Sequence, residues 1–313
     1  MILDWYRKWA QYSPDKVAIK EKLSGRSISY AELNRKAEAW SQYLLGIGLQ
    51  KGDRLAVLSE FNLEYFVLLG VAQKTGIILV PLNYRLSQVE LNYMLKDSGC
   101  KQLLIDEKFQ SQFSDWIIAP LALGGLDRLV QGYKAVHLDY SAPAEDDPLF
   151  ILYTSGTTGF PKGAIYTHKM AHWNSINTAL RLEVSAKDKC LQVMPPFHTG
   201  GWNVLATPLL HFGGSLVIVP SFDPEECLRS LSEESISLFM AVPTMVRMMS
   251  EAKNFEAADL SKLRYFIVGG EALALSQIEK WGKKGVPIRQ GYGLTETSPV
   301  VSCNPIHKIK VET

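Results

Sequence analysis

Residues 153–163 read YTSGTTGFPKG, and this polar stretch begins where an apolar run, 149–153, ends. The apolar run is typical of a buried strand, so the polar stretch is expected to form the loop that leaves it. Glycines let the backbone turn its N–H groups toward one point, the hydroxyl side chains add donors, and Lys162 adds a positive charge. The composition therefore predicts a loop that cradles a polyphosphate.

An ordinary loop rich in Ser, Thr and Gly is the alternative interpretation. Three glycines, several hydroxyls and a Pro-Lys pair in one short run argue against it. The spacing also differs from the GxxxxGK[ST] pattern of Walker-type nucleotide hydrolases, because Pro161 directly precedes Lys162. The stretch therefore predicts phosphate binding outside the Walker class.

A second stretch rich in glycine and hydroxyl groups reads QGYGLTETSP at 290–299, again after a short β-like run. Tyr292 could stack on a base, Thr295 could bond a phosphate oxygen, and Glu296 carries the hard oxygen ligands that Mg²⁺ prefers. This pattern alone is a weak signal. One basic and one acidic loop together predict a site for Mg²⁺ and a nucleotide.

Helical and strand patterns alternate along the rest of the chain. Strands are expected at 54–58, 77–81, 101–105, 149–153, 215–219, 238–242 and 265–268, and helices at 30–45, 63–74, 87–97, 169–182, 224–234, 243–252 and 276–283. Ser87 and Glu90 have the spacing of a capping box at the start of one helix. The segment 140–148 is expected to be a surface linker. The alternation predicts an α/β fold with parallel sheets.

The composition is that of a folded globular protein, with 313 residues of which 47% are hydrophobic and 21% charged. Lys plus Arg total 33 against 32 for Asp plus Glu, so a net charge of +1 gives no field that would attract nucleic acid. The four cysteines lack CxxC spacing, which favours thiols in a reducing cytosol. The most apolar stretch, 65–82, is interrupted by Gln73 and Lys74, so no membrane span is expected. Because 1–11 also lacks the pattern of a secretory signal, we expect a cytoplasmic protein.

Four motifs resemble those of the AMP-binding, adenylate-forming superfamily. Residues 153–163 look like its signature loop, and 291–296 look like its Tyr-Gly-x-Thr-Glu motif. The PPFHTGG stretch at 195–201 resembles the acyl-CoA synthetase branch, and VGGEAL at 268–273 resembles the adenine-pocket loop. The similarity covers essentially the whole chain, and the motifs occur in the family's order.

The resemblance implies an α/β fold with two stacked βαβ-type subdomains, approximately 50–185 and 15–49 plus 186–313. Residues 1–313 would then form an incomplete AMP-binding N-terminal domain that lacks the C-terminal lid domain. No Thr-Gly-Asp segment, hinge or small domain with a catalytic lysine follows the Thr-Glu motif. We expect a fragment, a natural truncation or a split enzyme with its C-terminal domain supplied in trans, and the abrupt ending at 308–313 favours a fragment.

The chemistry implied by the resemblance is the activation of a fatty or aryl carboxylic acid. The carboxylate attacks the α-phosphate of ATP, pyrophosphate leaves as an acyl-adenylate forms, and the thiol of coenzyme A then displaces AMP to give a thioester. Because two anions meet in the first step, the site needs preorganised positive charge more than an acid or a base. The expected partners are therefore the acid, ATP with Mg²⁺, and coenzyme A.

The resemblance also assigns roles to individual residues. Phosphate contacts are expected from Thr154, Ser155, Gly156, Thr157, Thr158, Gly159 and Lys162. The adenine would be lined by Gly270, Glu271 and Ala272, with Tyr292 against its face and Gly293 beside it. Thr295 would contact the α-phosphate and Glu296 would bind Mg²⁺. For Glu271, the alternative is a role as the N-cap of the helix that follows.

The acid is expected to bind near His198, Gly200, Gly201 and Trp202. The His198 ring would orient the carboxylate or gate access to it, and a satisfied core histidine is the alternative. The two glycines would leave room for an apolar group. Trp202 would form a wall of the acyl tunnel or simply fill the core. With Lys162, Thr295 and Glu296, His198 completes the set of residues expected to act in catalysis.

Three functions remain open from the sequence. The first is an AMP-forming acyl-CoA synthetase, present as its N-terminal part. The second is a module that binds ATP or an acyl group without turnover, which the missing C-terminal lysine would favour. The third is an adenylation domain that loads a carrier protein, and the sequence around His198 favours coenzyme A only modestly over this acceptor.

Overall fold

The computed structural model describes residues 1–132, 141–155, 159–297 and 302–303. The predicted phosphate contacts of Gly156, Thr157 and Thr158 lie outside the described residues. The chain divides into two compact units, which are treated separately below. The first unit contains Met1–Val17, Ile28–Trp173 and Pro196–His198, and the second contains Ala18–Ser27, Asn174–Pro195 and Thr199–Thr313.

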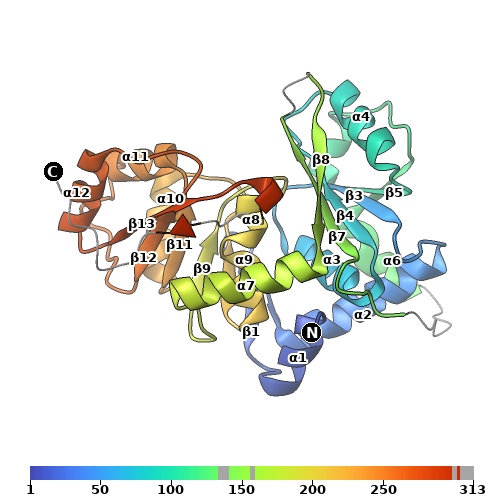
Figure 1. Ribbon diagram of the computed structural model, residues 1–313, viewed down its shortest axis with the longest axis horizontal. Coiled ribbons are helices and arrows are strands. Elements are labelled where there is room, and N and C mark those ends of the chain that lie inside the picture. The colour runs from blue at the N-terminus through green and yellow to red at the C-terminus, as the bar shows by residue number, and fades with distance from the viewer. Residues whose placement is uncertain (133–140, 156–158, 298–301, 304–313) are drawn as a thin grey trace. The chain divides into compact units, whose positions relative to one another are not determined.

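The first unit contains a six-stranded sheet with the order β6-β5-β3-β4-β7-β8. Its strands are β3 (Arg54–Leu58), β4 (Ile78–Pro81), β5 (Gln102–Ile105), β6 (Pro120–Ala122), β7 (Pro148–Thr154) and β8 (Lys162–Thr167). All neighbouring strands are parallel except β7 and β8, which form an antiparallel hairpin at the edge of the sheet (Figure 1).

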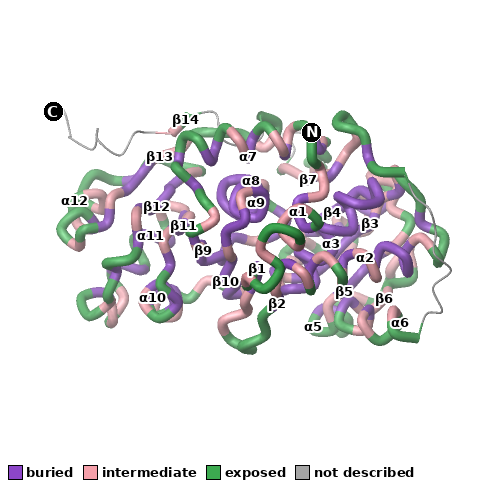
Figure 2. Tube along the Cα trace, turned by 90° about the horizontal axis from the view of Figure 1, so that it is seen from below, coloured by how far each residue is buried: buried purple, intermediate pink, exposed green. Residues whose placement is uncertain are grey.

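The helices of the first unit are α1 (Trp5–Tyr12), α2 (Tyr30–Gly46), α3 (Leu63–Thr75), α4 (Gln88–Ser98), α5 (Glu107–Gln110) and α6 (Leu126–Gly132), with a short 3₁₀ turn, η1 (Leu123–Gly125). Every residue of α3 is buried, as Figure 2 shows by its colour. The helix begins at the cap Asn62 and ends at Gly76, which adopts the left-handed conformation at φ 72°. An apolar helix with no polar face belongs in a core, and α3 forms the centre of this unit.

An eight-stranded sheet with the order β14-β13-β12-β11-β9-β10-β1-β2 has most of its residues in the second unit. Its strands are β1 (Val17–Glu21), β2 (Ser27–Ser29), β9 (Lys189–Gln192), β10 (Ser215–Ile218), β11 (Leu238–Ala241), β12 (Tyr265–Val268), β13 (Ile288–Tyr292) and β14 (Ser302–Cys303). The neighbouring strands from β1 to β13 in this order, namely β1-β10-β9-β11-β12-β13, pair in parallel. The last pair, β13 and β14, is antiparallel.

Helices cover this second sheet. They are α8 (Thr199–Asn203), α9 (Ala206–His211), α10 (Pro224–Glu233), α11 (Pro243–Glu251), α12 (Leu275–Lys283) and the 3₁₀ turn η2 (Thr295–Thr297), while α7 (His168–Leu182) has residues in both units. Trp281 of α12 is completely buried, with its ring centroid 4.5 Å from that of Phe266 on β12. This aromatic contact fixes α12 on the sheet.

The predicted α/β class with parallel sheets is confirmed. The strand at 54–58 and the strand at 265–268 have the predicted bounds, and the Ser87–Glu90 capping box is present at the start of α4. Within the described part of the chain, no helix combines the length and apolar character that crossing a membrane requires.

Candidate functional site

The predicted phosphate loop connects the two strands of the β7–β8 hairpin. Thr154 at the end of β7 pairs with Lys162 at the start of β8, and the Thr154 hydroxyl lies 3.5 Å from the carbonyl oxygen of Lys162. Ser155 and the Lys162 side chain are exposed, and Gly159 has a φ of 92°, which favours glycine. Among the described residues, Lys162 has no ion-pair partner. The hairpin therefore places a hydroxyl and an unpaired cation together at one end of the sheet.

Gly163 is required by the packing of this hairpin. It pairs with Tyr153 across the two strands. A Cβ atom at Gly163 would lie 2.7 Å from Cγ2 of Ile151 and 3.3 Å from Cζ of Tyr153. The missing side chain leaves the space that the Tyr153 ring uses, so this glycine is needed for close approach rather than for an unusual backbone angle.

His198 lies beside an aromatic cluster of the first unit. Its ring centroid is 4.7 Å from that of buried Phe197, which makes an edge contact with Tyr84 at 5.1 Å. Part of His198 reaches solvent, so the alternative of a satisfied core histidine is wrong. The surrounding protein partly removes the ring from water, and this effect, followed by the charge of Arg85, lowers the pKa of His198. The lowered pKa favours the neutral imidazole, which can both donate and accept a hydrogen bond.

Arg85 is a candidate residue that sequence reasoning missed. Its guanidinium carbon lies 5.8 Å from the Tyr84 ring centroid and 5.6 Å from that of Phe197. The side chain is exposed, and no described acidic group pairs with it. The available signal was its position just after the strand at 77–81, because ligands bind beyond the carboxyl ends of parallel strands.

In the second unit, the two predicted nucleotide loops leave neighbouring strands at the same edge of the sheet. Val268 at the end of β12 pairs in parallel with Gln290 of β13. The Gln290 side-chain oxygen accepts a hydrogen bond of 2.7 Å from the backbone N–H of Leu273. A Cβ atom at Gly269 would lie 3.5 Å from the carbonyl oxygen of Gly291. The segment around Gly270 and the segment after Tyr292 are therefore brought together.

The residues expected to contact adenine are accessible. The exposed residues are Gly270, Glu271, Ala272, Tyr292 and Gly293, and Tyr292 has 63% of its surface exposed. The alternative role of Glu271 as a helix cap is wrong, because α12 begins at Leu275 and its N-cap is Ala274. An exposed aromatic ring beside a glycine-rich turn is suited to stacking against a base.

Glu296 lies in the turn η2, where the Leu294 N–H donates to the Thr297 hydroxyl at 3.1 Å. Its carboxylate is exposed and forms no ion pair with a described residue, while neighbouring Thr295 is partly buried. No group of three or more His, Cys, Asp and Glu side chains that could hold a metal occurs in the described ranges. Mg²⁺ can bind through one or two carboxylates when phosphates supply other ligands, so an unpaired Glu296 fits that mode.

The predicted acid-binding glycines lie in α8, near the carboxyl ends of β9 and β11. A Cβ atom at Gly200 would lie 3.0 Å from Cε of Met240. The Gly201 carbonyl oxygen accepts a 2.5 Å hydrogen bond from the Gln192 side chain, and Trp202 is completely buried. Any larger residue at Gly200 would displace the flexible end of Met240.

The predicted residues thus fall into two sets, one in each unit. The first unit holds Thr154, Ser155, Gly159, Lys162 and His198, and the second holds Gly200, Gly201, Trp202, Gly270, Glu271, Ala272, Tyr292, Gly293, Thr295 and Glu296. Within the first unit, the structure pairs Thr154 with Lys162. Within the second unit, it joins the segments after β12 and β13.

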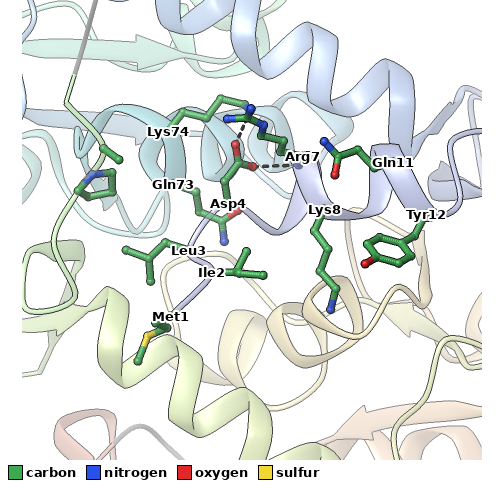
Figure 3. A pocket seen from close by; sticks show the side chains of 12 residues that line it. Met1, Ile2, Leu3, Asp4, Arg7, Lys8, Gln11, Tyr12, Gln73 and Lys74 are labelled. Carbon is green, nitrogen blue, oxygen red and sulfur yellow. Dashed lines mark hydrogen bonds and ion pairs between the residues drawn. The ribbon is translucent and has the colours of Figure 1, made fainter.

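A cavity of about 480 Å³ in the first unit contains none of these residues (Figure 3). It is lined by the start of the chain, α1, the end of α3 and 142–143. Lys74 forms a 2.6 Å ion pair with Asp4 on its wall. The Gln73 side chain, only 2% exposed, also lines it, and its amide has no described hydrogen-bond partner.

The chain is similar to curated coenzyme A ligases. A feruloyl-CoA synthase from an Amycolatopsis species is 31% identical over 300 residues, which cover 95% of this chain and 60% of the relative. The long-chain-fatty-acid–CoA ligase FadD13 of Mycobacterium tuberculosis is 31% identical over 306 residues, covering 93% and 59%. The chain therefore spans about 60% of the length of these curated relatives.

A solved structure is similar throughout the chain. The o-succinylbenzoate coenzyme A synthetase of Bacillus subtilis, in complex with ATP and magnesium ion, has a TM-score of 0.86 and 26% sequence identity, and the match covers 97% of this chain and 62% of that one. The profile of the family described as AMP-binding enzyme matches residues 6–313. The family match covers nearly the whole chain and agrees with the two parallel-dominated sheets, so the chain belongs to the AMP-binding enzyme family.

Proposed function

We propose that the chain is the N-terminal part of an AMP-forming acid–thiol ligase. It would activate a carboxylic acid as an acyl-adenylate at the expense of ATP and pass the acyl group to coenzyme A. The observation that carries this proposal is the β7–β8 hairpin, which pairs Thr154 with Lys162 across a glycine-rich loop. The similarity to two coenzyme A ligases supports the class of reaction.

The hairpin would hold the β- and γ-phosphates of ATP. The Lys162 ammonium would pair with phosphate oxygens, while the Thr154 and Ser155 hydroxyls would donate to them. Because Lys162 has no competing described carboxylate, its charge is available to an anionic substrate. Preorganised donors of this kind lower the barrier because they need not reorient as charge develops on the leaving pyrophosphate.

The second unit would bind the nucleoside. Adenine would lie against exposed Tyr292 and along the Gly270–Ala272 backbone, and the Thr295 hydroxyl would donate to the α-phosphate. Glu296 would hold a Mg²⁺ ion, which when bound to ATP neutralises negative charge on the phosphates. The exposed carboxylate in η2, which forms no ion pair with a described residue, supports this assignment.

The carboxylate of the acid would bind near His198. The neutral ring can donate one hydrogen bond to a carboxylate oxygen without being an anion itself, and Arg85 adds a positive charge to the same region. A cation here also reduces the repulsion between the carboxylate and ATP. The two relatives suggest an aryl or a fatty acid as the substrate, and the assay described next distinguishes these two classes.

The test is ATP–pyrophosphate exchange with a panel of aryl and fatty acids, run on this chain and on any longer polypeptide that contains it. We expect exchange that depends on one class of acid, and loss of about 100-fold in Lys162→Met, since removal of one preorganised donor costs this much. Lys169→Met is the matched control, because Lys169 is also exposed but lies on α7 beside Asp146.

Three outcomes separate the candidate functions. Exchange followed by transfer of the acyl group to coenzyme A supports the proposal. Transfer to a carrier protein alone would replace it with a carrier-loading adenylation domain. Binding of Mg-ATP by calorimetry without exchange in either polypeptide would replace it with a binding module.

A further inference from the structure

We propose that helix α4 positions the phosphate loop, because Asp97 and Tyr93 of this helix hold the two flanks of the loop. The inference rests on the proposed function for its consequence in catalysis, since the loop is the proposed ATP site. Its structural part concerns only the first unit, in which α4 lies beside the end of the β7–β8 hairpin (Figure 1). Asp97 and Tyr93 are positioning residues, because neither is placed in contact with ATP.

The flank on β7 is held by a hydrogen bond. The Tyr153 hydroxyl donates to a carboxylate oxygen of Asp97 at 2.7 Å, and the carbonyl oxygen of Met94 lies 3.2 Å from the same hydroxyl. Tyr153 directly precedes Thr154, the last residue of β7, so this bond fixes the end of the strand from which the loop begins. A hydrogen bond to a charged acceptor is stronger than one between neutral groups.

The Tyr153 hydroxyl retains its proton over the working pH range. Partial burial and then the bond to Asp97 raise the pKa of Tyr153 well above its usual value. The proton therefore stays between the phenol oxygen and the carboxylate, and the hydroxyl remains a donor. The ring has room to lie in this direction because the residue paired with it across the hairpin is Gly163.

The flank toward β8 is held by a ring contact. Phe160 leaves 55% of its surface exposed, yet its ring centroid lies 4.8 Å from that of Tyr93 on α4. Phe160 directly precedes Pro161 and Lys162. Because Tyr93 and Asp97 are four residues apart, they occupy one face of the helix, and that face meets both flanks.

Helix α4 is itself held in place, by caps at both of its ends and by buried side chains. Its start has a complete capping box between Ser87 and Glu90, and its end has Gly99 in the left-handed conformation at φ 61°. Leu91, Met94 and Leu95 are buried in the core of the unit. The opposite face of the helix therefore anchors it to the sheet while Tyr93 and Asp97 face the loop.

Holding both flanks fixes the backbone beside Thr154 and Lys162, so less conformational freedom of these two residues is lost when a polyphosphate binds. Ordering of side chains and backbone opposes binding, so a loop held in advance binds its ligand more tightly. Loss of either α4 contact should therefore weaken ATP binding and leave the contacts of the carboxylic acid unchanged. This separation distinguishes positioning of the loop from a general effect on folding.

The experiment compares Tyr153→Phe, Asp97→Ala, Asp97→Asn and the double variant Tyr153→Phe/Asp97→Ala in two measurements. Hydrogen–deuterium exchange of peptides that cover 154–162 measures order in the loop without ATP. Titration with Mg-ATP then measures affinity. Tyr12→Phe is the control, because Tyr12 is a tyrosine of the same unit with 75% of its surface exposed, and thermal melting shows which variants remain folded.

We expect Tyr153→Phe and Asp97→Ala each to raise exchange in 154–162 and to weaken Mg-ATP binding about tenfold, as for loss of one charged hydrogen bond. The double variant should be no worse than either single variant, because both remove one interaction. Asp97→Asn should retain most of the affinity, since its amide oxygen still accepts the bond. In a polypeptide that turns over, the KM for ATP should rise while the KM for the acid stays constant.

Unchanged exchange in 154–162 for both Tyr153→Phe and Asp97→Ala, with the variants folded, would overturn the inference. Additive effects of the two substitutions would also overturn it, because they would place the residues in separate interactions. If the unaltered chain failed to bind Mg-ATP, the proposed function would fail at that step. The exchange measurement would still decide whether α4 orders the loop.

Discussion

The β7–β8 hairpin and the loop after β12 each depend on a glycine, but for different reasons. At Gly163, a side chain would collide with Ile151 and crowd Tyr153, whereas its backbone angles are ordinary. At Gly270, the nearest atom to an added Cβ is 3.8 Å away, but φ is 89°. A side chain at Gly163 is therefore opposed by neighbouring side chains, and one at Gly270 by the conformation of its own backbone. A smaller neighbouring side chain can relieve the crowding at Gly163, whereas no change of a neighbour relieves the positive φ at Gly270.

The largest predicted effect concerns the negative charge of Glu296 in the second unit. Glu296→Gln keeps the shape of the side chain but removes the negative charge proposed to hold Mg²⁺. We expect pyrophosphate exchange to fall by about 100-fold, comparable to loss of a group that stabilises the transition state. Asp259→Asn is the control, since it alters another exposed acidic residue of this unit. Equal losses in both variants would argue against a role for Glu296.

The next effect tests crowding at Gly163. Gly163→Ala is expected to reduce the free energy of unfolding by about 2 kcal/mol, within the usual range for overpacking. Ile151→Ala has a cost of its own, but the double variant should lose less than the sum of the two single losses, because the Cγ2 methyl that lies 2.7 Å from the new Cβ is gone. Denaturant unfolding of the three variants measures the coupling. Strictly additive losses would show that the collision is not the cause.

A smaller effect is expected at Gly270. Gly270→Ala should reduce the free energy of unfolding by about 1 to 2 kcal/mol, because a side chain disfavours positive φ. Gly270→Asn should cost less, since asparagine tolerates this region better than alanine does. The same unfolding measurement serves as the test. An asparagine variant no more stable than the alanine variant would contradict a purely backbone effect.

The smallest effect concerns a charge in the first unit. Arg85→Gln should raise the pKa of His198, because removing a nearby cation favours the protonated ring. The shift is partial since burial, the larger cause of the depressed pKa, remains. NMR titration of the His198 ring protons measures it. An unchanged or lower pKa would show that Arg85 does not act on this ring.

Local signals explain what could be predicted of the fold. The capping pair Ser87 and Glu90 marked the start of α4, and the apolar run at 63–74 marked α3. The strands β1, β2, β6, β8, β9 and β14 were not predicted. β8 reads KGAIYT, has a single buried residue and pairs with β7 along its length, so neither hydrophobic alternation nor a buried run identified it.

The candidate site was predictable to the extent that its chemistry is written in consecutive residues. Thr154 and Lys162 were identified because they share one short loop. Asp97 was not, because it is 56 residues from Tyr153 and only the folded chain joins the two. Arg85 was missed because Phe197, whose ring centroid lies 5.6 Å from its guanidinium carbon, becomes its neighbour only through tertiary packing.

The complete burial of α3 has a consequence for tolerance to mutation. All thirteen residues of the helix, Leu63–Thr75, are buried. Even Lys74 is buried, and its ammonium group forms an ion pair with Asp4. In α12, by contrast, Trp281 is the buried residue of the helix. In a library of random substitutions, we therefore expect every position of α3 to tolerate few substitutions. In α12, we expect most positions to tolerate substitution and Trp281 not to.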